Sequence, residues 1–474
     1  MSRKQSGLLG AVGAVAAAAL AASLASPVHA ADREKGTPVP CSVPALVSAI
    51  DTANAATGEV PLRLAPHCVY TLNSANTGET GLPVVTGRVR IEGRGAVISR
   101  GPAASGLFRL FEVANGGRLT LSGLTLNGGS TSGNGGGIAV RAGGELRASD
   151  VTVRQNRSDS NGGGIEVESG ATATLKDSRV RNNVARLQAG GINANGTVSL
   201  LRSSVAENES TASYGGGINI DAPNARLTVR KSSVSHNRAA LGSGGFDLDN
   251  GIVEIRDSEV TGNEAATSAG GIYHEAQSLI IDSSRITRNS AVLGSGGIEA
   301  FQGLTVTNSK ITHNRVTEVQ PGDGFGGGGV TLYVGNATFI KTEITDNTVT
   351  ARDGRGGGVY ILGSNTLNVK FERSLIARNA AIGDSAFAGG ISQEGGAQVT
   401  LRNTPVTANR STNTPGGVWT DTQFVTVENS PIRNNVPANC TGSPVIVTGC
   451  TATALTTPAP SFTYPGPRPR PTKP

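Results

Sequence analysis

Large aromatic side chains are scarce in this sequence. Phe, Trp and Tyr together make up 4% of the 474 residues, and Trp and Met occur once each. A chain of this length exceeds what one ordinary hydrophobic core supports, and so few large side chains are unusual for a compact core. We therefore expect several domains or a repeat array rather than one globular unit.

Clustered positive charge and paired metal-binding cysteines are also missing. The formal net charge is +6, and charged residues at the two ends of the chain supply much of it, so the body of the chain is near neutral. A general nucleic-acid-binding surface needs clustered positive charge and is not expected. The four cysteines include no Cys-x-x-Cys pair, which argues against zinc and redox chemistry.

Only the N-terminus carries a long apolar run. Arg3 and Lys4 precede an Ala-rich apolar stretch over residues 8–24, and Ala30 ends a small-residue cleavage site. This order is typical of a secretory signal peptide, so we expect a secreted, extracellular mature chain that begins at Ala31. A retained membrane anchor is the alternative. No other stretch is long and apolar enough to span a bilayer, so no span is expected in the mature chain.

Two short motifs alternate along some three hundred residues, mostly 26 to 28 residues apart. The first is a Gly-Gly-apolar step, whose apolar residues are Ile138, Ile165, Ile192, Ile218, Phe246, Ile272, Ile298, Val330, Val359, Ile391 and Val418. The second is apolar-x-x-Asn, whose asparagines are Asn156, Asn183, Asn208, Asn237, Asn263, Asn289, Asn314, Asn347, Asn379, Asn409 and Asn435. Such regularity indicates a repeat architecture.

Each repeat contains three short segments in which apolar and polar residues alternate, as in residues 163–167, 227–232 and 234–237. This alternation predicts strands with one buried face, and no stretch keeps a helical period. Three strands per repeat predict an all-β, right-handed parallel β-helix, a three-sided solenoid of about twelve coils. We expect the glycines to allow tight corners and the asparagines to stack as an amide ladder. A leucine-rich repeat is the alternative architecture.

A solenoid needs caps at its open ends. Residues 44–56 can form a short helix that covers the N-terminal end. Of the three possible cysteine pairings, Cys41–Cys68 and Cys440–Cys450 is favoured because each pair is close in sequence. The predicted parts are a signal peptide (1–30), an N-terminal helical cap (31–84), the β-helix (85–437), a C-terminal cap (438–455) and a disordered, Pro-rich basic tail (456–474).

The alternating Gly-Gly and apolar-x-x-Asn motifs resemble the repeats of polymorphic outer-membrane proteins, which are secreted β-helix adhesins. More broadly, they are similar to the pectate-lyase-like superfamily of right-handed parallel β-helix proteins, which includes pectate lyases and polygalacturonases. The resemblance covers roughly residues 110–440. Only 39 residues follow Asn435, too few for the translocating barrel of those outer-membrane proteins, so we do not expect an autotransporter.

Candidate functional residues come from the outward positions of the strand that follows each Gly-Gly step. Row one holds Ala139, Glu166, Asn193, Asn219, Asp247, Tyr273, Glu299, Thr331, Tyr360, Ser392 and Trp419. Row two, two residues further along each repeat, holds Arg141, Glu168, Asn195, Asp221, Asp249, Glu275, Phe301, Tyr333, Leu362, Glu394 and Asp421. We expect both rows to form an exposed face that is acidic and carries aromatic side chains.

This face supports two functional hypotheses. The first is a non-enzymatic, adhesin-like monomer that binds a polysaccharide or cell-surface glycan; its candidate binding residues are Tyr273, Glu299, Phe301, Tyr333 and Tyr360. The second is a polysaccharide lyase or glycoside hydrolase, because superfamily members use the same face; its candidate catalytic residues are Asp221, Asp247, Asp249 and Glu275.

No cofactor is expected, with one open possibility. Asp221, Asp249 and Glu275 occupy one row on successive coils, where like charges repel each other. A raised pKa, a bound Ca²⁺ or plain solvent could each relieve that repulsion. A polygalacturonase-like Gly-His-Gly element is absent from the sequence, and His274 falls at an inward position where we expect it to be buried.

Overall fold

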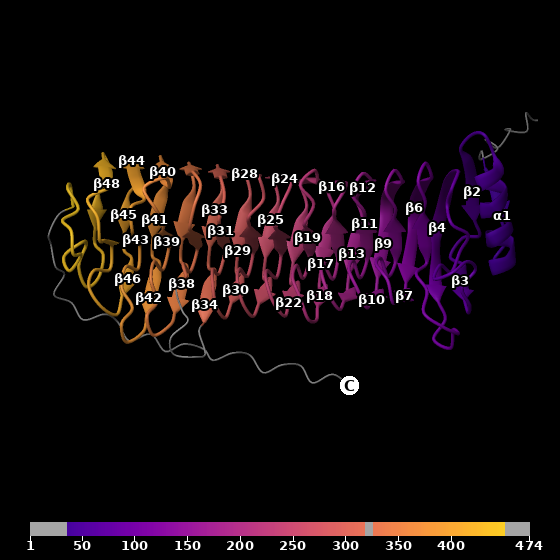
Figure 1. Cartoon of the computed structure of the whole chain (residues 1–474), viewed down its shortest axis with the longest axis horizontal. Coiled ribbons are helices and arrows are strands. Elements are labelled where there is room, and N and C mark those ends of the chain that lie inside the picture. The colour runs from indigo at the N-terminus through magenta and orange to yellow at the C-terminus, as the bar shows by residue number, and fades with distance from the viewer. Residues whose placement is uncertain (1–35, 318–325, 451–474) are drawn as a thin grey trace, which may run out of the picture. The chain divides into compact units, whose positions relative to one another are not determined.

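The computed structural model of the protein describes residues 36–317 and 326–450. The predicted signal peptide and Pro-rich tail lie outside the described residues. The described part forms a right-handed parallel β-solenoid of about 14 turns (Figure 1). Its three sheets contain 26, 12 and 11 strands. The all-β, three-sided fold predicted from the repeats is therefore confirmed.

The eleven strands that follow the Gly-Gly steps, together with β5 at the N-terminal edge, form the 12-stranded sheet, here called the Gly-Gly sheet. It consists of β5 (Phe111–Val113), β8 (Ile138–Val140), β11 (Ile165–Val167), β15 (Ile192–Ala194), β19 (Ile218–Ile220), β23 (Phe246–Leu248), β27 (Ile272–His274), β31 (Ile298–Ala300), β35 (Val330–Leu332), β39 (Val359–Leu362), β43 (Ile391–Glu394) and β47 (Val418–Thr420). Ile165, Ile192 and Ile218 are register partners with no exposed surface, so they line one continuous interior.

The 26-stranded sheet, here called the bent sheet, holds both of the other predicted strands of each repeat. It consists of β1 (Thr37–Val39), β2 (Val60–Leu64), β3 (Val69–Leu72), β4 (Arg88–Arg100), β6 (Arg118–Asn127), β9 (Glu145–Arg154), β12 (Thr172–Lys176), β13 (Arg179–Arg181), β16 (Thr197–Leu201), β17 (Ser204–Ala206), β20 (Arg226–Arg230), β21 (Ser233–Ser235), β24 (Ile252–Arg256), β25 (Glu259–Thr261), β28 (Ser278–Asp282), β29 (Arg285–Thr287), β32 (Leu304–Thr307), β33 (Lys310–Thr312), β36 (Ala337–Ile340), β37 (Glu343–Thr345), β40 (Asn368–Glu372), β41 (Leu375–Ala377), β44 (Gln398–Arg402), β45 (Val406–Thr407), β48 (Val425–Glu428) and β49 (Ile432–Arg433).

A single residue with positive φ bends this sheet in each coil, as at Arg202 (φ 48°) and Lys231 (φ 50°). The serine that follows the bend is fixed by a second ladder, because the backbone N–H of Ser203 donates to Ser232 Oγ (3.0 Å) and that of Ser232 donates to Ser258 Oγ (3.1 Å). One left-handed residue can turn a chain sharply. The two predicted strands therefore share one bent sheet instead of forming two separate sides.

The third side is built from short strands directly after the ladder asparagines, here called the corner sheet. It consists of β7 (Ser130–Thr131), β10 (Arg157–Ser158), β14 (Val184–Ala185), β18 (Glu209–Ser210), β22 (Arg238–Ala239), β26 (Glu264–Ala265), β30 (Ser290–Ala291), β34 (Arg315–Thr317), β38 (Thr348–Thr350), β42 (Ala380–Ile382) and β46 (Arg410–Ser411). Most have two residues, which is too short for an alternating pattern to be visible in the sequence.

The ladder asparagines are buried and bonded from coil to coil. Both the backbone N–H and Nδ2 of Asn237 donate to Asn263 Oδ1 at 3.0 Å, and Asn263 repeats this arrangement with Asn289 at 3.0 and 2.9 Å. Nδ2 of Asn263 also donates to the carbonyl of Val234 (3.0 Å). Each amide thus satisfies buried backbone and side-chain groups of neighbouring coils, which confirms the predicted amide ladder.

The one helix in the described ranges, α1 (Val43–Ala55), lies at the N-terminal end of the solenoid (Figure 1) and packs against β1, β3 and β4. Pro44 occupies its first turn, and Leu46 and Ile50 are buried. Cys41 is bonded to Cys68, and Cys440 to Cys450, as the sequence spacing favoured. Within residues 36–317 and 326–450, no helix has the length and apolar character of a membrane span.

The asparagine ladder generates a stability prediction. Asn263→Ala removes the acceptor for two Asn237 donors and the donor for the Val234 carbonyl, so buried polar groups lose their partners. We expect a loss of about 2–4 kcal/mol in the free energy of unfolding, measured by chemical denaturation. Asn365→Ala, at an exposed asparagine, is the control and should change stability by less than about 0.5 kcal/mol. Equal losses in both variants would contradict the role of the ladder.

Candidate functional site

The residues of row one lie directly above one another on successive coils, as predicted, but most of their side chains are buried. Asp247 pairs in register with Tyr273, and Tyr273 with Glu299. The exposed fraction is 1% for Asp247, 5% for Glu299 and 1% for Tyr360. The expectation that these three side chains lie on an open face was therefore wrong. Of the row-one residues proposed for binding or catalysis, Tyr273 alone remains partly exposed; Trp419, in the last coil, is also partly exposed.

The loops that precede each Gly-Gly step cover row one. The backbone N–H of Ser243 donates to Asp247 Oδ2 (2.8 Å), and that of Gly327 donates to Thr331 Oγ1 (2.7 Å). At Gly162, whose φ is +63°, an added Cβ would lie 2.9 Å from Glu166 Oε2. Each loop therefore crosses directly over the outward side chain four residues further along, which removes that side chain from solvent.

Buried polar side chains in row one bond to each other. Nδ2 of Asn193 donates to Glu166 Oε1 (3.0 Å), and Nδ2 of Asn219 donates to Asn193 Oδ1 (2.9 Å). Oε2 of Glu166 and Oδ1 of Asn219 are buried without a hydrogen-bond partner. Burial raises the pKa of Glu166 to about 8, because desolvation disfavours its charged form. Glu166 is a buried carboxyl that the sequence-based candidates did not include.

Row two carries the accessible carboxylates. Asp221 and Glu275 are exposed and Asp249 is half-buried. Burial, followed by the charges of Asp221 and Glu275, raises the pKa of Asp249 to about 6, which means that the three carboxylates interact. Among the described residues, no group of three or more His, Cys, Asp or Glu side chains is arranged to hold a metal ion. The Ca²⁺ hypothesis for this trio gains no support from the structure.

A cavity of about 360 Å³ opens beside this trio. Its lining residues are Tyr214, Gly242, Asp247, Asp249, Ser268 and Tyr273. Burial and the charge of Asp249 raise the pKa of Asp247 well above its usual value. The Tyr273 hydroxyl donates to Glu275 Oε1. The cavity thus brings together a buried carboxyl group, a half-buried one and two tyrosines.

The loop residues of this cavity were not predicted. Tyr214, which is 43% exposed, precedes a Gly-Gly step, and so do Gly242 and Ser268. Most covering loops differ in sequence from one repeat to the next, so alignment of the repeats gives little weight to these positions. The useful signal is Tyr214 itself, a large aromatic residue at a loop position where Phe387 is the one other aromatic residue among the repeats.

Three aromatic side chains continue from the cavity along the Gly-Gly sheet. The Tyr273 and Phe301 ring centroids are 5.5 Å apart, and those of Phe301 and Tyr333 are 4.3 Å apart with nearly parallel rings. All three side chains are partly exposed. The Tyr333 hydroxyl donates to Glu299 Oε1 (3.3 Å). The structure therefore brings together three of the predicted binding residues, whereas Tyr360 and Glu299 lie buried beside them.

His274 lies inside the solenoid, as predicted. It has no exposed surface, and its Nε2 lies 3.0 Å from the carbonyl oxygen of Gly303. Burial lowers its pKa, which keeps the ring neutral. His274 is therefore a buried structural residue and not part of the cavity.

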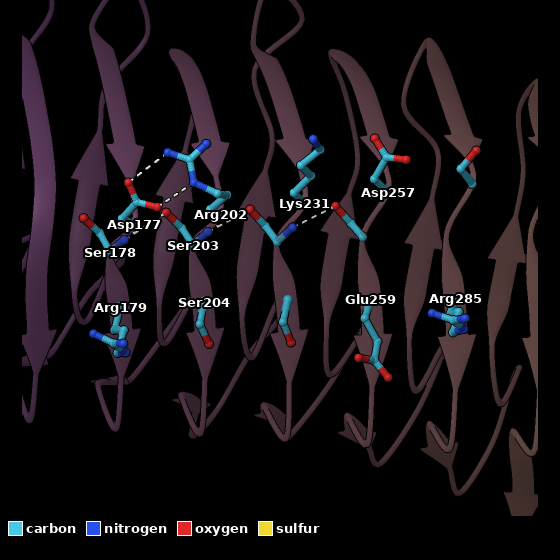
Figure 2. Close-up of a pocket in the computed structure, with 14 residues that line it drawn as sticks. Asp177, Ser178, Arg179, Arg202, Ser203, Ser204, Lys231, Asp257, Glu259 and Arg285 are labelled. Atoms are coloured by element: carbon cyan, nitrogen blue, oxygen red, sulfur yellow. Dashed lines mark hydrogen bonds and ion pairs between the residues drawn. The ribbon is translucent and has the colours of Figure 1, made fainter.

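A second cavity, of about 440 Å³, follows the bend of the bent sheet (Figure 2). Its floor holds ladder serines, and its walls carry side chains of both charges, including Arg179, Lys231 and Glu259. Nε of Arg202 pairs with Asp177 Oδ1 (2.7 Å), as the dashed lines in Figure 2 show. Because positive and negative groups alternate along this groove, it favours no one class of ligand.

The comparison with protein-family models agrees with the fold. Residues 298–456 match the family model described as "Right handed beta helix region". Among solved structures, the chain is similar to the A-module of the mannuronan C-5 epimerase AlgE6 from Azotobacter vinelandii, at 15% sequence identity and a TM-score of 0.37, over 82% of this chain and 94% of that chain. No curated protein matched the sequence. The chain is a right-handed parallel β-helix repeat protein.

The buried carboxyl of Glu166 generates a pH prediction. Its pKa is about 8 in the folded protein, above the usual value of 4.5, so the folded state binds the proton more tightly. Stability is therefore lost as pH rises between these two values. Glu166→Gln, which cannot ionise, should remove this loss and stabilise the protein at pH values above 8 by about 1–4 kcal/mol.

The measurement is the unfolding free energy of both proteins across this pH range. Glu259→Gln, at an exposed glutamate of the bent sheet, is the matched control and should leave the pH profile unchanged. A Glu166→Gln profile that falls as steeply as that of the unaltered protein would contradict the assignment.

Proposed function

We propose that this protein is a secreted β-solenoid that binds an extracellular glycan on the outer face of the Gly-Gly sheet. The observation that carries the proposal is the partly exposed stack of Tyr273, Phe301 and Tyr333 on three successive coils. Sugar rings present apolar C–H faces, and aromatic rings provide flat apolar surfaces for such contacts. We define the aromatic stack and the adjacent 360 Å³ cavity as the glycan site.

Polar groups around the stack favour a sugar over a purely apolar ligand. Asp249 and Glu275 supply acceptors for sugar hydroxyls at one end of the stack, and the Tyr214 hydroxyl is accessible at the cavity rim. Ligand sites commonly combine apolar surface with a few polar groups that set orientation. Successive coils repeat this environment at the strand spacing of about 4.8 Å, which suits an extended chain more than a single small molecule.

An extracellular location is part of the proposal. Both disulfide bonds are compatible with an oxidising compartment. The predicted signal peptide would direct the chain there. A protein of this kind would be adhesin-like, using a long repetitive surface to hold a glycan without altering it.

A second candidate function is cleavage of the glycan by a lyase or hydrolase. The specific observation is that Asp247 and Asp249, two residues apart at the end of β23, differ in environment, because burial raises the pKa of Asp247 well above its usual value and that of half-buried Asp249 only to about 6. Such a pair could serve as general acid and general base. Asp247 is only 1% exposed, so its proton is poorly placed to reach a substrate. Binding therefore ranks above cleavage.

The binding proposal is tested by Phe301→Ala. Removal of the central ring should weaken binding to any glycan that the protein retains by at least about tenfold, since both stacking partners lose their neighbour. Isothermal titration calorimetry with soluble oligosaccharides measures the change. Leu107→Ala removes an exposed apolar side chain outside the glycan site and should leave affinity unchanged. Unaltered affinity in the Phe301→Ala protein would exclude the stack as the binding surface.

The cleavage candidate is tested separately with Asp249→Asn. If the protein cleaves a polysaccharide, this change should lower the rate by about 100-fold or more, because it removes the only half-exposed carboxylate of the cavity. Release of reducing ends or of unsaturated sugars is measured, with Glu259→Gln as the control. Cleavage that persists unchanged would exclude the Asp247–Asp249 pair, whereas absence of cleavage in the unaltered protein leaves binding as the function.

A further inference from the structure

We infer that the glycan bound at this site carries free amino groups, as in polymers of glucosamine type. The inference rests on the proposed function and names the chemical class of its ligand. It depends on three features of the site: unneutralised carboxylates, aromatic faces beside them, and a buried acceptor without a partner. Each feature favours a cationic hydrogen-bond donor over a neutral or anionic sugar.

Arginine side chains pair with carboxylates of row two on either side of the glycan site, but not at the glycan site itself. Towards the N-terminus, Arg141 pairs with both Glu112 and Glu168 at 2.8 Å. Towards the C-terminus, Arg355 pairs with Glu394. Between these two arginines lies the carboxylate trio of Asp221, Asp249 and Glu275. No Lys, Arg or His among the described residues forms an ion pair with it.

Adjacent like charges on neighbouring strands are destabilising, so the trio favours a ligand that supplies positive charge. The same carboxylates would repel the acidic sugars of a polyuronate. A bridging metal ion is not indicated, because the described side chains include no group arranged to hold one. A cationic ligand would supply that positive charge.

The aromatic stack begins beside this carboxylate trio. Tyr273 donates its hydroxyl proton to Glu275, and its ring neighbours that of Phe301. A sugar ammonium group at this point would contact a carboxylate and an aromatic face together. Aromatic faces attract cations, and the attraction increases when water is excluded. A partly buried stack beside carboxylates is therefore better matched to an amino sugar than to its uncharged N-acetyl form.

Glu299 adds a buried acceptor to the wall of the site. Its Oε1 accepts from Tyr333, while its Oε2 has no partner, and the side chain is 5% exposed. A Cβ added to Gly294 would lie 2.8 Å from this Oε2 and 2.1 Å from the carbonyl oxygen of Ser268, a residue that lines the cavity. The orphaned oxygen therefore lies beneath the covering loop at Gly294, beside the aromatic stack, as a buried acceptor without a partner.

The experiment compares three oligosaccharides of equal length by isothermal titration calorimetry: β-1,4-linked glucosamine, its fully N-acetylated form, and an oligouronate. The glucosamine oligomer should bind at least about tenfold more tightly than the N-acetylated form. The oligouronate should bind more weakly than both. Glu275→Gln should weaken glucosamine binding at least about fivefold and binding of the N-acetylated form by less, because the amide keeps an acceptor for sugar hydroxyls but loses the charge. Glu259→Gln, away from the site, should change neither.

The outcomes separate this inference from the proposed function. Equal or tighter binding of the N-acetylated or uronate oligomer, lost in Phe301→Ala, overturns the amino-sugar inference and keeps the glycan site. Binding of none of the three, or binding that survives Phe301→Ala, overturns both. If Glu275→Gln folds poorly, as seen by circular dichroism, Asp249→Asn provides the same comparison at the neighbouring coil.

Discussion

The asparagine ladder is the interaction on which the rest of the structure depends. From Asn183 to Asn409, each ladder amide accepts from the backbone and side chain of one neighbouring coil and donates to the next. These groups are buried, so a coil that slipped out of register would leave several of them without partners, at a cost of about 1–3 kcal/mol each. The ladder therefore fixes the height of every coil relative to its neighbours.

Because the register is fixed, each repeated sequence position forms a row of side chains along the solenoid. Because equivalent positions lie directly above one another, Phe301 and Tyr333 of row two stack on each other and three carboxylates form one charged strip, while Tyr273 of row one lies beside Phe301. The same stacking places Glu166 and Asp247 beneath covering loops, where desolvation raises their pKa values. At the glycan site both rows reach solvent, and Arg141 and Arg355 pair with Glu168 and Glu394 of row two on either side of it.

The sequence predicted what repeats in every coil. The interior isoleucines, the asparagine ladder, the disulfide pairing and the buried His274 all follow from periodicity or spacing. It could not predict the burial of Asp247, Glu299 and Tyr360, because the loops that cover them vary from coil to coil. The corner sheet was not predicted because its strands are too short to show an alternating pattern of apolar and polar residues. The bend at residues such as Arg202 was not predicted because it depends on the φ angle of one residue.

Hydrogen–deuterium exchange with peptide-level mass spectrometry tests the central claim most directly. If the ladder fixes the register of the coils, the backbone amides of Asn183, Asn208, Asn237 and Asn263 should exchange as slowly as those of the interior strands, although each lies at a corner of the chain. Rapid exchange at these corners, at rates typical of exposed loops, would contradict the account, because rows of aligned side chains could not then persist.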